Sequence, residues 1–253
     1  MTPEHDDAPV AIVTGGSGGI GRAYVRGLLE AGYRVVVADI ADPAPDAHAA
    51  STDADQTLPL RVDVSDRHST EAMAETVLAS FGRIDLLINN AAYFSAIVKK
   101  PLEDISVEEW DLAFAVNVRG AWLCACAVLP AMKRQGHGRI INTSSMTFHG
   151  GGITGFAHYA STKAAIVGLT RSMARELGDF GITVNTISPD YIAHAGGLFD
   201  RQPEMASNLA AQRSIKREGT PEDLVGAVLF LAGPGADFVT GQDIWVNGGR
   251  IFG

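Results

Sequence analysis

Short runs rich in Val, Ile and Leu alternate with longer amphipathic segments along almost the whole chain of 253 residues. Near-continuous β-branched runs are typical of strands covered on both faces, as in a parallel sheet between two layers of helices. The pattern therefore predicts an α/β fold, a Rossmann-type doubly wound parallel seven-stranded sheet in three α/β/α layers. The predicted strands are residues 10–14, 34–38, 60–64, 85–89, 139–143, 182–187 and 243–246.

The sequence predicts one domain over residues 1–253, because no internal repeat and no linker interrupts this alternation. Residues 1–8 are polar and are expected to be a flexible N-terminus. Residues 41–58 are rich in Pro, Asp and Ala, so the second crossover is predicted to be short or irregular. A long helical pattern begins at Leu112 and continues to Gly136, a typical terminator.

Composition favours small-molecule chemistry. The formal net charge is -9 and basic residues form no runs, which argues against binding to nucleic acid or to a membrane surface. No apolar run approaches the ~20 residues of a membrane span, and the acidic start is unlike a signal peptide. Only Cys124 and Cys126 occur, at a spacing that suits neither a disulfide nor a metal site. We therefore expect a reduced, cytoplasmic protein.

A glycine-rich segment, T-G-G-S-G-G-I-G, follows the first predicted strand. Gly15, Gly19 and Gly21 at a strand-to-helix turn would let the backbone approach a pyrophosphate at the helix N-terminus, although glycine clusters also mark plain turns. Asp39 ends the second strand, where a carboxylate can bind ribose hydroxyls and would repel a 2′-phosphate. With Gly18 where a phosphate-binding cation would be needed, the sequence favours NAD over NADP.

Further polar residues follow other strands. Asp63 comes after the third predicted strand, and Asn89 and Asn90 come at the end of the fourth. These positions share the carboxyl edge at which open α/β sheets bind ligands. Asp and Asn are also ordinary turn and cap residues, so position carries this inference more than residue type does.

Tyr159 and Lys163 are four residues apart in H-Y-A-S-T-K, which places both side chains on one face of a helix. An ammonium beside the phenol would favour the phenolate and lower the pKa of Tyr159, making it a candidate general acid and base. Taken alone, such a pair is more often a surface lysine near a core tyrosine.

Several motifs together resemble the short-chain dehydrogenase/reductase family of single-domain enzymes of about 250 residues. They are T-G-G-S-G-G-I-G at 14–21, V-D-V at 62–64, N-N-A-A at 89–92, N-V-R-G at 117–120, I-N-T-S-S at 141–145, Y-A-S-T-K at 159–163 and T-G-Q-D-I-W-V-N-G-G at 240–249. The resemblance implies a catalytic group of Asn117, Ser145, Tyr159 and Lys163. It also implies NAD-binding residues Gly15, Ser17, Gly19, Ile20, Gly21, Asp39, Ile40, Asp63, Val64, Asn89, Ala91, Tyr159, Lys163, Pro189 and Ile192.

In that family Ser145 would hydrogen-bond the substrate oxygen and Tyr159 would exchange a proton with it. Lys163 would hold the nicotinamide ribose, and Asn117 would support a water in a proton relay. Ser145 stands fourteen positions before Tyr159, one more than the family's usual spacing, so Ser144 is the competing assignment.

Two departures from the family pattern stand close together. Asp190 replaces a glycine, and His194 stands where the family has a threonine. Smaller departures are Ala92 and Asn247. The histidines His149, His158 and His194 follow no metal-ligand spacing, so no metal site is predicted.

The expected substrate is a small-molecule secondary alcohol or ketone, hydrophobic and cyclic or aromatic, because Tyr93, Phe94 and Phe148 belong to loops at the active edge. The segment 190–219 is expected to cover it. The alternatives are a 3-oxoacyl-thioester (acyl-carrier-protein) reductase using NADPH and a non-catalytic NAD-binding sensor. By resemblance, a homotetramer is expected.

Overall fold

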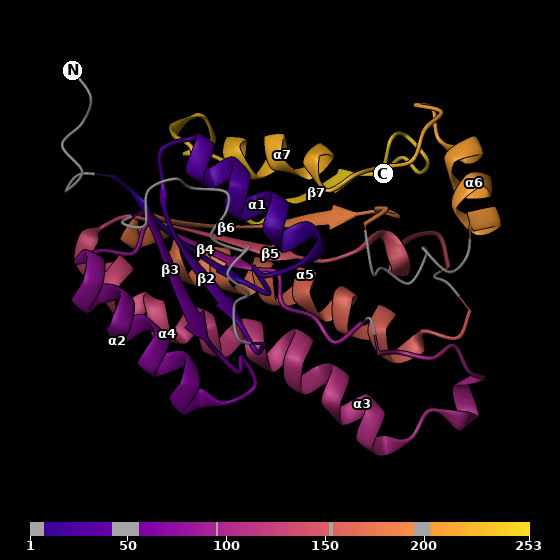
Figure 1. The fold of residues 1–253 in the computed structure, drawn as a ribbon, viewed down its shortest axis with the longest axis horizontal. Helices are drawn as coiled ribbons and strands as arrows, with labels where there is room; N and C mark the ends of the chain where they lie inside the picture. The colour runs from indigo at the N-terminus through magenta and orange to yellow at the C-terminus, as the bar shows by residue number, and fades with distance from the viewer. Residues whose placement is uncertain (1–7, 42–55, 95, 152–153, 195–202) are drawn as a thin grey trace.

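A seven-stranded sheet forms the centre of the protein, and every neighbouring pair of strands is parallel. The computed structural model describes residues 8–41, 56–94, 96–151, 154–194 and 203–253 (Figure 1). The strand order is β3-β2-β1-β4-β5-β6-β7. The strands are β1 (Val10–Thr14), β2 (Arg34–Asp39), β3 (Thr57–Arg61), β4 (Leu86–Asn89), β5 (Gly138–Thr143), β6 (Ile182–Pro189) and β7 (Asp243–Val246). The order reverses between β1 and β4, which confirms the doubly wound fold.

Helices cover both faces of the sheet, and each face has its own core. On one face α1 (Gly19–Glu30) packs against β1 and β2, and α7 (Glu222–Ala232) packs against β5 and β6. On the other lie α2 (Arg67–Phe81), α4 (Gly120–Gln135) and α5 (Ala157–Leu177). The five inner strands are thus buried on both faces, as their Val and Ile runs predict, while the edge strands β3 and β7 are half-buried. Outside these layers are α3 (Val107–Phe114) and α6 (Pro203–Gln212), at one end of the molecule in Figure 1.

The predicted third strand, 60–64, is wrong, because β3 occupies Thr57–Arg61. β3 is an edge strand, where Pro59 is tolerated without a full ladder of hydrogen bonds. Val62 and Val64 are buried in the core just beyond the strand. Their alternation with polar residues therefore has the pattern of a strand, although β3 ends before them. Of the irregular crossover predicted at 41–58, residues 42–55 lie outside the described residues, as do residues 1–7 of the expected flexible terminus.

The long helical pattern begins earlier than predicted, at Val107, behind a capping box formed by Ser106 and Glu109. A π-helical turn, Ala115–Arg119, joins α3 to α4, and α4 ends at Gly136 with φ of 64° as predicted.

The continuous helix Val107–Gln135 is long and apolar enough to meet the criterion for a membrane span, which corrects the expectation that no such run exists. It is the one candidate within the described residues, and 44% of its most apolar window is buried inside the protein. Leu123, Cys124 and Val128 on α4 belong to the core, with exposures of 4% or less, so the α4 part of the segment packs as a core helix.

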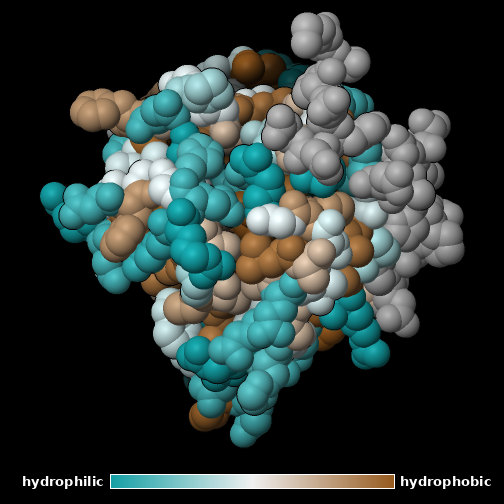
Figure 2. Space-filling model, turned by 90° about the vertical axis from the view of Figure 1, so that its left-hand side faces the viewer, coloured by the Kyte–Doolittle hydropathy of each residue, from teal (hydrophilic) through white to brown (hydrophobic). Residues whose placement is uncertain are grey.

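The face on the side of α2 and the N-terminus carries mostly hydrophilic residues around a smaller group of hydrophobic ones near its centre (Figure 2). The carboxyl ends of the strands and the loops that follow them surround a different feature, a cavity.

Candidate active site

A cavity of about 590 Å³ lies at the carboxyl edge of the sheet. Its wall takes residues from the turn after β1, from the ends of β2, β4, β5 and β6, and from α5, α6 and the C-terminal tail. This is the edge at which open α/β sheets bind ligands, because the strand order reverses there and leaves a crevice.

The glycine-rich turn between β1 and α1 forms one end of the cavity. Gly15 has φ of 63°, and a Cβ there would lie 2.9 Å from the Cα of Ala91. A Cβ on Gly21 would come within 2.0 Å of the Gly15 carbonyl oxygen, so both positions require glycine. A Cβ on Gly18, by contrast, would meet nothing within 4 Å. The turn therefore presents open backbone at the start of α1, as a site for a pyrophosphate requires.

Asp39 lies at the same end of the cavity. Its carboxylate accepts hydrogen bonds from the backbone N–H of Ser17 at 3.0 Å and of Ala41 at 3.2 Å. These bonds fix the carboxylate beside the glycine turn. Ile40 also lines the cavity and is 64% exposed.

Most of the predicted cofactor residues line this cavity: Gly15, Gly19, Ile20, Asp39, Ile40, Asp63, Val64, Ala91, Tyr159, Lys163, Pro189 and Ile192. The cavity wall does not include three other predicted cofactor residues, Ser17, Gly21 and Asn89, whose role in cofactor binding stays a prediction. Asn89 donates to the side chain of Asn142 at 2.9 Å and to the Ala121 carbonyl at 3.2 Å, joining β4 to β5 and α4.

Tyr159 and Lys163 both face the cavity from α5, and both are buried, with exposures of 8% and 3%. The Lys163 Nζ donates to the Thr143 carbonyl at 2.7 Å and lies 5.6 Å from the centre of the Tyr159 ring. The helical spacing thus brings the two side chains to one place, as predicted, but the ammonium bonds β5 rather than the phenol.

The expected acidic phenol is wrong for this structure. Burial raises the pKa of Tyr159 to about 12, partly offset by a hydrogen bond with the Ser145 side chain. Burial also lowers the pKa of Lys163 to about 8. The low-polarity surroundings disfavour both charged forms.

The two candidate serines occupy different environments after β5. The Ser144 hydroxyl is buried and donates to the backbone carbonyl of Lys163 at 2.7 Å. The Ser145 hydroxyl lies 2.6 Å from that of Thr147 and interacts with Tyr159. Ser144 therefore fastens α5 to β5, while Ser145 is placed to act together with the phenol.

Asn117 sits in the π-helical turn and is 3% exposed. Its side-chain oxygen accepts from the Tyr93 N–H at 2.7 Å, and its amide donates to Thr162 at 3.0 Å. The wider turn aims this side chain at the loop after β4 and at α5 at once. Asn117 does not line the large cavity, but it shares with Lys163 a separate cavity of about 10 Å³, close to the size of one water molecule.

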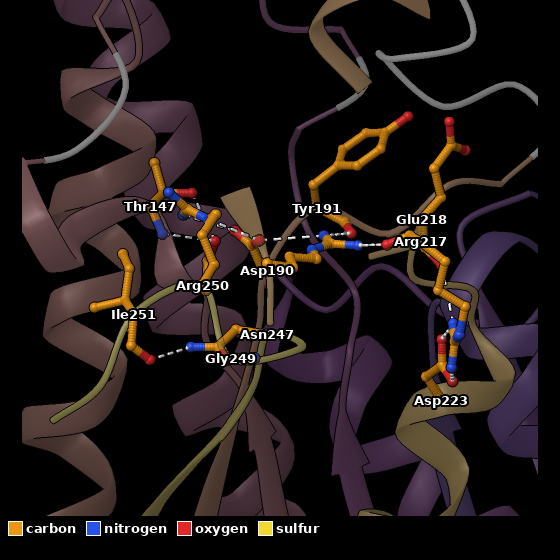
Figure 3. A network of polar contacts seen from close by, with 12 residues as sticks. Thr147, Asp190, Tyr191, Arg217, Glu218, Asp223, Asn247, Gly249, Arg250 and Ile251 are labelled. Atoms are coloured by element: carbon orange, nitrogen blue, oxygen red, sulfur yellow. Dashed lines mark hydrogen bonds and ion pairs between the residues drawn. The ribbon is translucent and has the colours of Figure 1, made fainter. Parts of the chain in front are cut away.

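The two departures from the family pattern both line the cavity. The ring of His194 lies 3.2 Å from where a Cβ on Gly19 would be, so it covers the glycine turn. Asp190 binds Arg213 and Arg250, and its contact with Arg250 can be followed in Figure 3.

Sequence reasoning missed cavity residues on the loops around the substrate end. They are Met146, Thr147, Phe156, Arg250 and Ile251. Tyr93 and Phe148, expected there, are not part of the wall, whereas Phe94 and His149 are. Arg250 had one available signal, since it follows a glycine pair that begins one residue after the last strand, at the same edge of the sheet.

The comparisons with known proteins agree with this architecture. The family model described as Enoyl-(Acyl carrier protein) reductase matches residues 15–250. The chain is 36% identical to the (2S)-[(R)-hydroxy(phenyl)methyl]succinyl-CoA dehydrogenase subunit BbsD of Thauera aromatica, over 95% of this chain and 96% of that one. It is 36% identical to the 3-oxoacyl-[acyl-carrier-protein] reductase FabG of Staphylococcus aureus (strain N315), over 94% and 96%.

A solved structure of levodione reductase superposes with a TM-score of 0.89 at 31% identity, covering 96% of this chain and 97% of that one. Such proteins bind a nicotinamide dinucleotide at the glycine turn of a Rossmann fold. The chain therefore belongs to the short-chain dehydrogenase/reductase family of oxidoreductases.

Proposed function

We propose that the protein is an NAD-dependent oxidoreductase that interconverts a secondary alcohol and a ketone, and that its substrate is hydrophobic and cyclic or aromatic. One observation supports this above all: Ser145, Tyr159 and Lys163 share a single cavity with Asp39, which stands beside the glycine turn. A proton-transfer group and a nucleotide-binding end are thus joined in one space.

The residues present fit a nicotinamide dinucleotide. Gly18 leaves open room at the start of α1, where backbone N–H groups favour a pyrophosphate. The Ser17 hydroxyl, just behind, is buried without a hydrogen-bond partner among the described residues. Pro189, the last residue of β6, and Ile192, just beyond the strand, would contact the nicotinamide end. When bound, the dinucleotide supplies the hydride acceptor or donor.

Side chains of the protein would carry out the proton transfer. Tyr159 would take the alcohol proton during oxidation and return it during reduction, and Ser145 would donate a hydrogen bond to the same oxygen. Lys163 would hold the ribose and place a positive charge near the phenol, and Asn117 would hold the water of a relay. A phenol whose pKa is raised by burial needs that charge more than an exposed phenol does.

Asp39 supports NAD over NADP. Its fixed carboxylate can accept hydrogen bonds from ribose hydroxyls and would repel a 2′-phosphate. Arg22 supplies a positive charge at the same turn, where its guanidinium donates to the Ser17 carbonyl at 2.8 Å. Asp39→Ser should therefore raise kcat/KM with NADP relative to NAD by at least about tenfold, a change expected from removing one charge repulsion.

The apolar wall supports a hydrophobic substrate. Phe94 packs on Tyr159 with ring centres 4.5 Å apart and on Phe156 at 5.9 Å. Met205 and Leu209 of α6 line the same cavity. The described part of the segment 190–219 therefore includes cavity-lining residues, as expected for a substrate cover.

A reductase of 3-oxoacyl thioesters is the second candidate, supported by the similarity to FabG. The carboxylate of Asp39 opposes it to the extent that such a reductase uses NADPH. Acetoacetyl-CoA with NADPH is the discriminating assay: turnover faster than that of every secondary alcohol with NAD would favour this candidate.

The main experiment is a panel of secondary alcohols and ketones assayed with NAD(H) and NADP(H), by absorbance of the reduced nicotinamide, on the wild type and Tyr159→Phe. We expect NAD-dependent turnover that falls by about 10²–10⁴-fold in the variant. NAD binding, measured by calorimetry, should be retained. A sensor would instead show no turnover in either protein while still binding NAD.

We also propose a homotetramer in the cytoplasm. Trp110, Leu112 and Trp122 are exposed at 37%, 44% and 42% on α3 and α4, and Leu112 and Trp122 line an open groove together with Leu169 of α5. Large exposed apolar groups on adjacent helices are typical of subunit interfaces. Light scattering of the wild type and Trp122→Glu tests this, since the variant should dissociate to smaller species.

A further inference from the structure

Asp190 lies at the centre of a buried cluster in which one carboxylate is shared by two arginines (Figure 3). Arg250 binds it through Nη2 at 2.7 Å and Nε at 2.9 Å, and Arg213 binds it through Nη2 at 3.1 Å. The side chains are 6%, 19% and 3% exposed for Asp190, Arg250 and Arg213. Since guanidinium groups stay protonated, the cluster carries one excess positive charge next to the cavity.

The two arginines differ in which of their N–H groups remain available for further hydrogen bonds. Arg213 also donates to the backbone carbonyls of Tyr191 and Arg217, so it serves the protein's own backbone. Arg250 gives Nε and Nη2 to Asp190, and its Nη1 makes no hydrogen bond within the part of the chain that the structure describes. Arg250 lines the cavity, whereas Arg213 does not. A donor with a positive charge is therefore available on the cavity wall.

The surroundings do not neutralise that charge. Among the described residues of the wall, the other carboxylates are Asp39 and Asp63, which follow β2 and β3. Lys99 adds a second cation at the substrate end, because its Nζ lies 4.0 Å from the Met205 sulfur and 5.6 Å from the centre of the Phe156 ring. This local excess of positive charge is opposite in sign to the net charge of the whole chain, which is -9.

We propose that the cavity selects a substrate bearing a carboxylate, and that Arg250 binds this carboxylate through Nη1 while Asp190 holds the guanidinium in place. The inference rests on the proposed function and narrows its substrate class to hydrophobic hydroxy or oxo acids. A charge-assisted hydrogen bond in a largely buried site discriminates a carboxylate from a neutral amide by roughly 10- to 100-fold.

The test compares aryl-substituted hydroxy acids with their primary amides, which have almost the same shape but no charge. One to four methylene groups separate the carbinol from the carboxylate, so that one member matches the span to Arg250. We expect the best acid to exceed its amide at least tenfold in kcat/KM in the wild type. Arg250→Gln should reduce this ratio to near one, mainly by raising KM for the acid, while turnover of the amide is kept.

Arg250→Gln leaves Asp190 paired with Arg213, so the fold should survive, as thermal unfolding and NAD binding would verify. Arg26→Gln is the matched control, because it removes the same charge from an exposed ion pair with Glu222. The control should keep the wild-type preference for acids.

Equal kcat/KM for acids and amides at every chain length in the wild type would overturn the inference and leave the proposed function intact. An unchanged preference in Arg250→Gln would overturn it too. If no alcohol of either kind reacts, the proposed function fails. Binding of non-reactive phenylalkanoates to the NAD-bound protein, measured by calorimetry, then decides the inference separately, since binding that is lost in Arg250→Gln supports it and equal binding contradicts it.

Discussion

The ammonium group of Lys163 lies 5.6 Å from the centre of the Tyr159 ring and directs its hydrogen bond to the Thr143 carbonyl at 2.7 Å. The lysine therefore influences the phenol by its charge across a short gap, and it also fastens α5 to the end of β5. Both groups are removed from water, which is why neither pKa moves in the direction that a simple ion-pair argument suggests.

The buried lysine should make stability depend on pH. The pKa of Lys163 is about 8 in the folded protein and 10.5 when exposed, so between these values the unfolded chain binds more protons and stability rises with pH. The free energy of unfolding of the wild type minus that of Lys163→Met should increase by roughly 2 kcal/mol from pH 7 to pH 9.5. Urea titrations at several pH values below 10 measure this. A difference independent of pH would contradict the burial of a charged group.

Substitution of Ser145 and of Ser144 should affect different properties of the protein, turnover in the first case and stability in the second. Ser145→Ala should lower kcat by about 10²–10³-fold with little loss of stability, because it removes a donor to the reacting oxygen. Ser144→Ala should lower the free energy of unfolding by about 1 kcal/mol, through loss of the bond to the Lys163 carbonyl, and keep most turnover. Steady-state kinetics and urea unfolding on both variants check this. Loss of turnover in Ser144→Ala alone would refute the assignment of Ser145.

Asn117 should matter for the loop after β4 as well as for turnover. Asn117→Ala leaves the Tyr93 N–H without its acceptor, which should cost about 1–3 kcal/mol of stability and speed amide exchange at Tyr93. Thr162→Val is the control, because it removes the hydrogen bond between Thr162 and Asn117 but keeps the hydrogen bond from the Tyr93 N–H to the Asn117 side chain. Hydrogen exchange with mass spectrometry distinguishes them, and equal protection of the loop in both variants would be the contrary result.

Removal of the shared carboxylate should be far more damaging than removal of either arginine. Asp190→Asn leaves two largely buried guanidiniums facing each other, and the expected cost is roughly 3–5 kcal/mol in the free energy of unfolding. Glu71→Gln, which breaks an exposed pair with Arg67, should cost less than about 1 kcal/mol. Thermal or urea unfolding of both variants provides the comparison. Similar losses would show that the cluster is not desolvated in solution.

Local patterns in the chain were enough for most of the fold. Six of the predicted strands appear within two residues of their observed ends, because a strand covered on both faces needs a continuous apolar run wherever it lies. The glycine turn, Asp39 at a strand end, and Tyr159 and Lys163 on one helical face were equally local, fixed by spacings of a few residues.

What the sequence by itself determined was the sheet, the nucleotide-binding end and the pairing of Tyr159 with Lys163. Only the tertiary structure decided that burial raises the phenol pKa, that β3 ends three residues early at the sheet edge, and that Asp190 meets Arg250 sixty positions away. Desolvation and contacts between distant segments depend on how the whole chain packs, and no short window of residues contains that information.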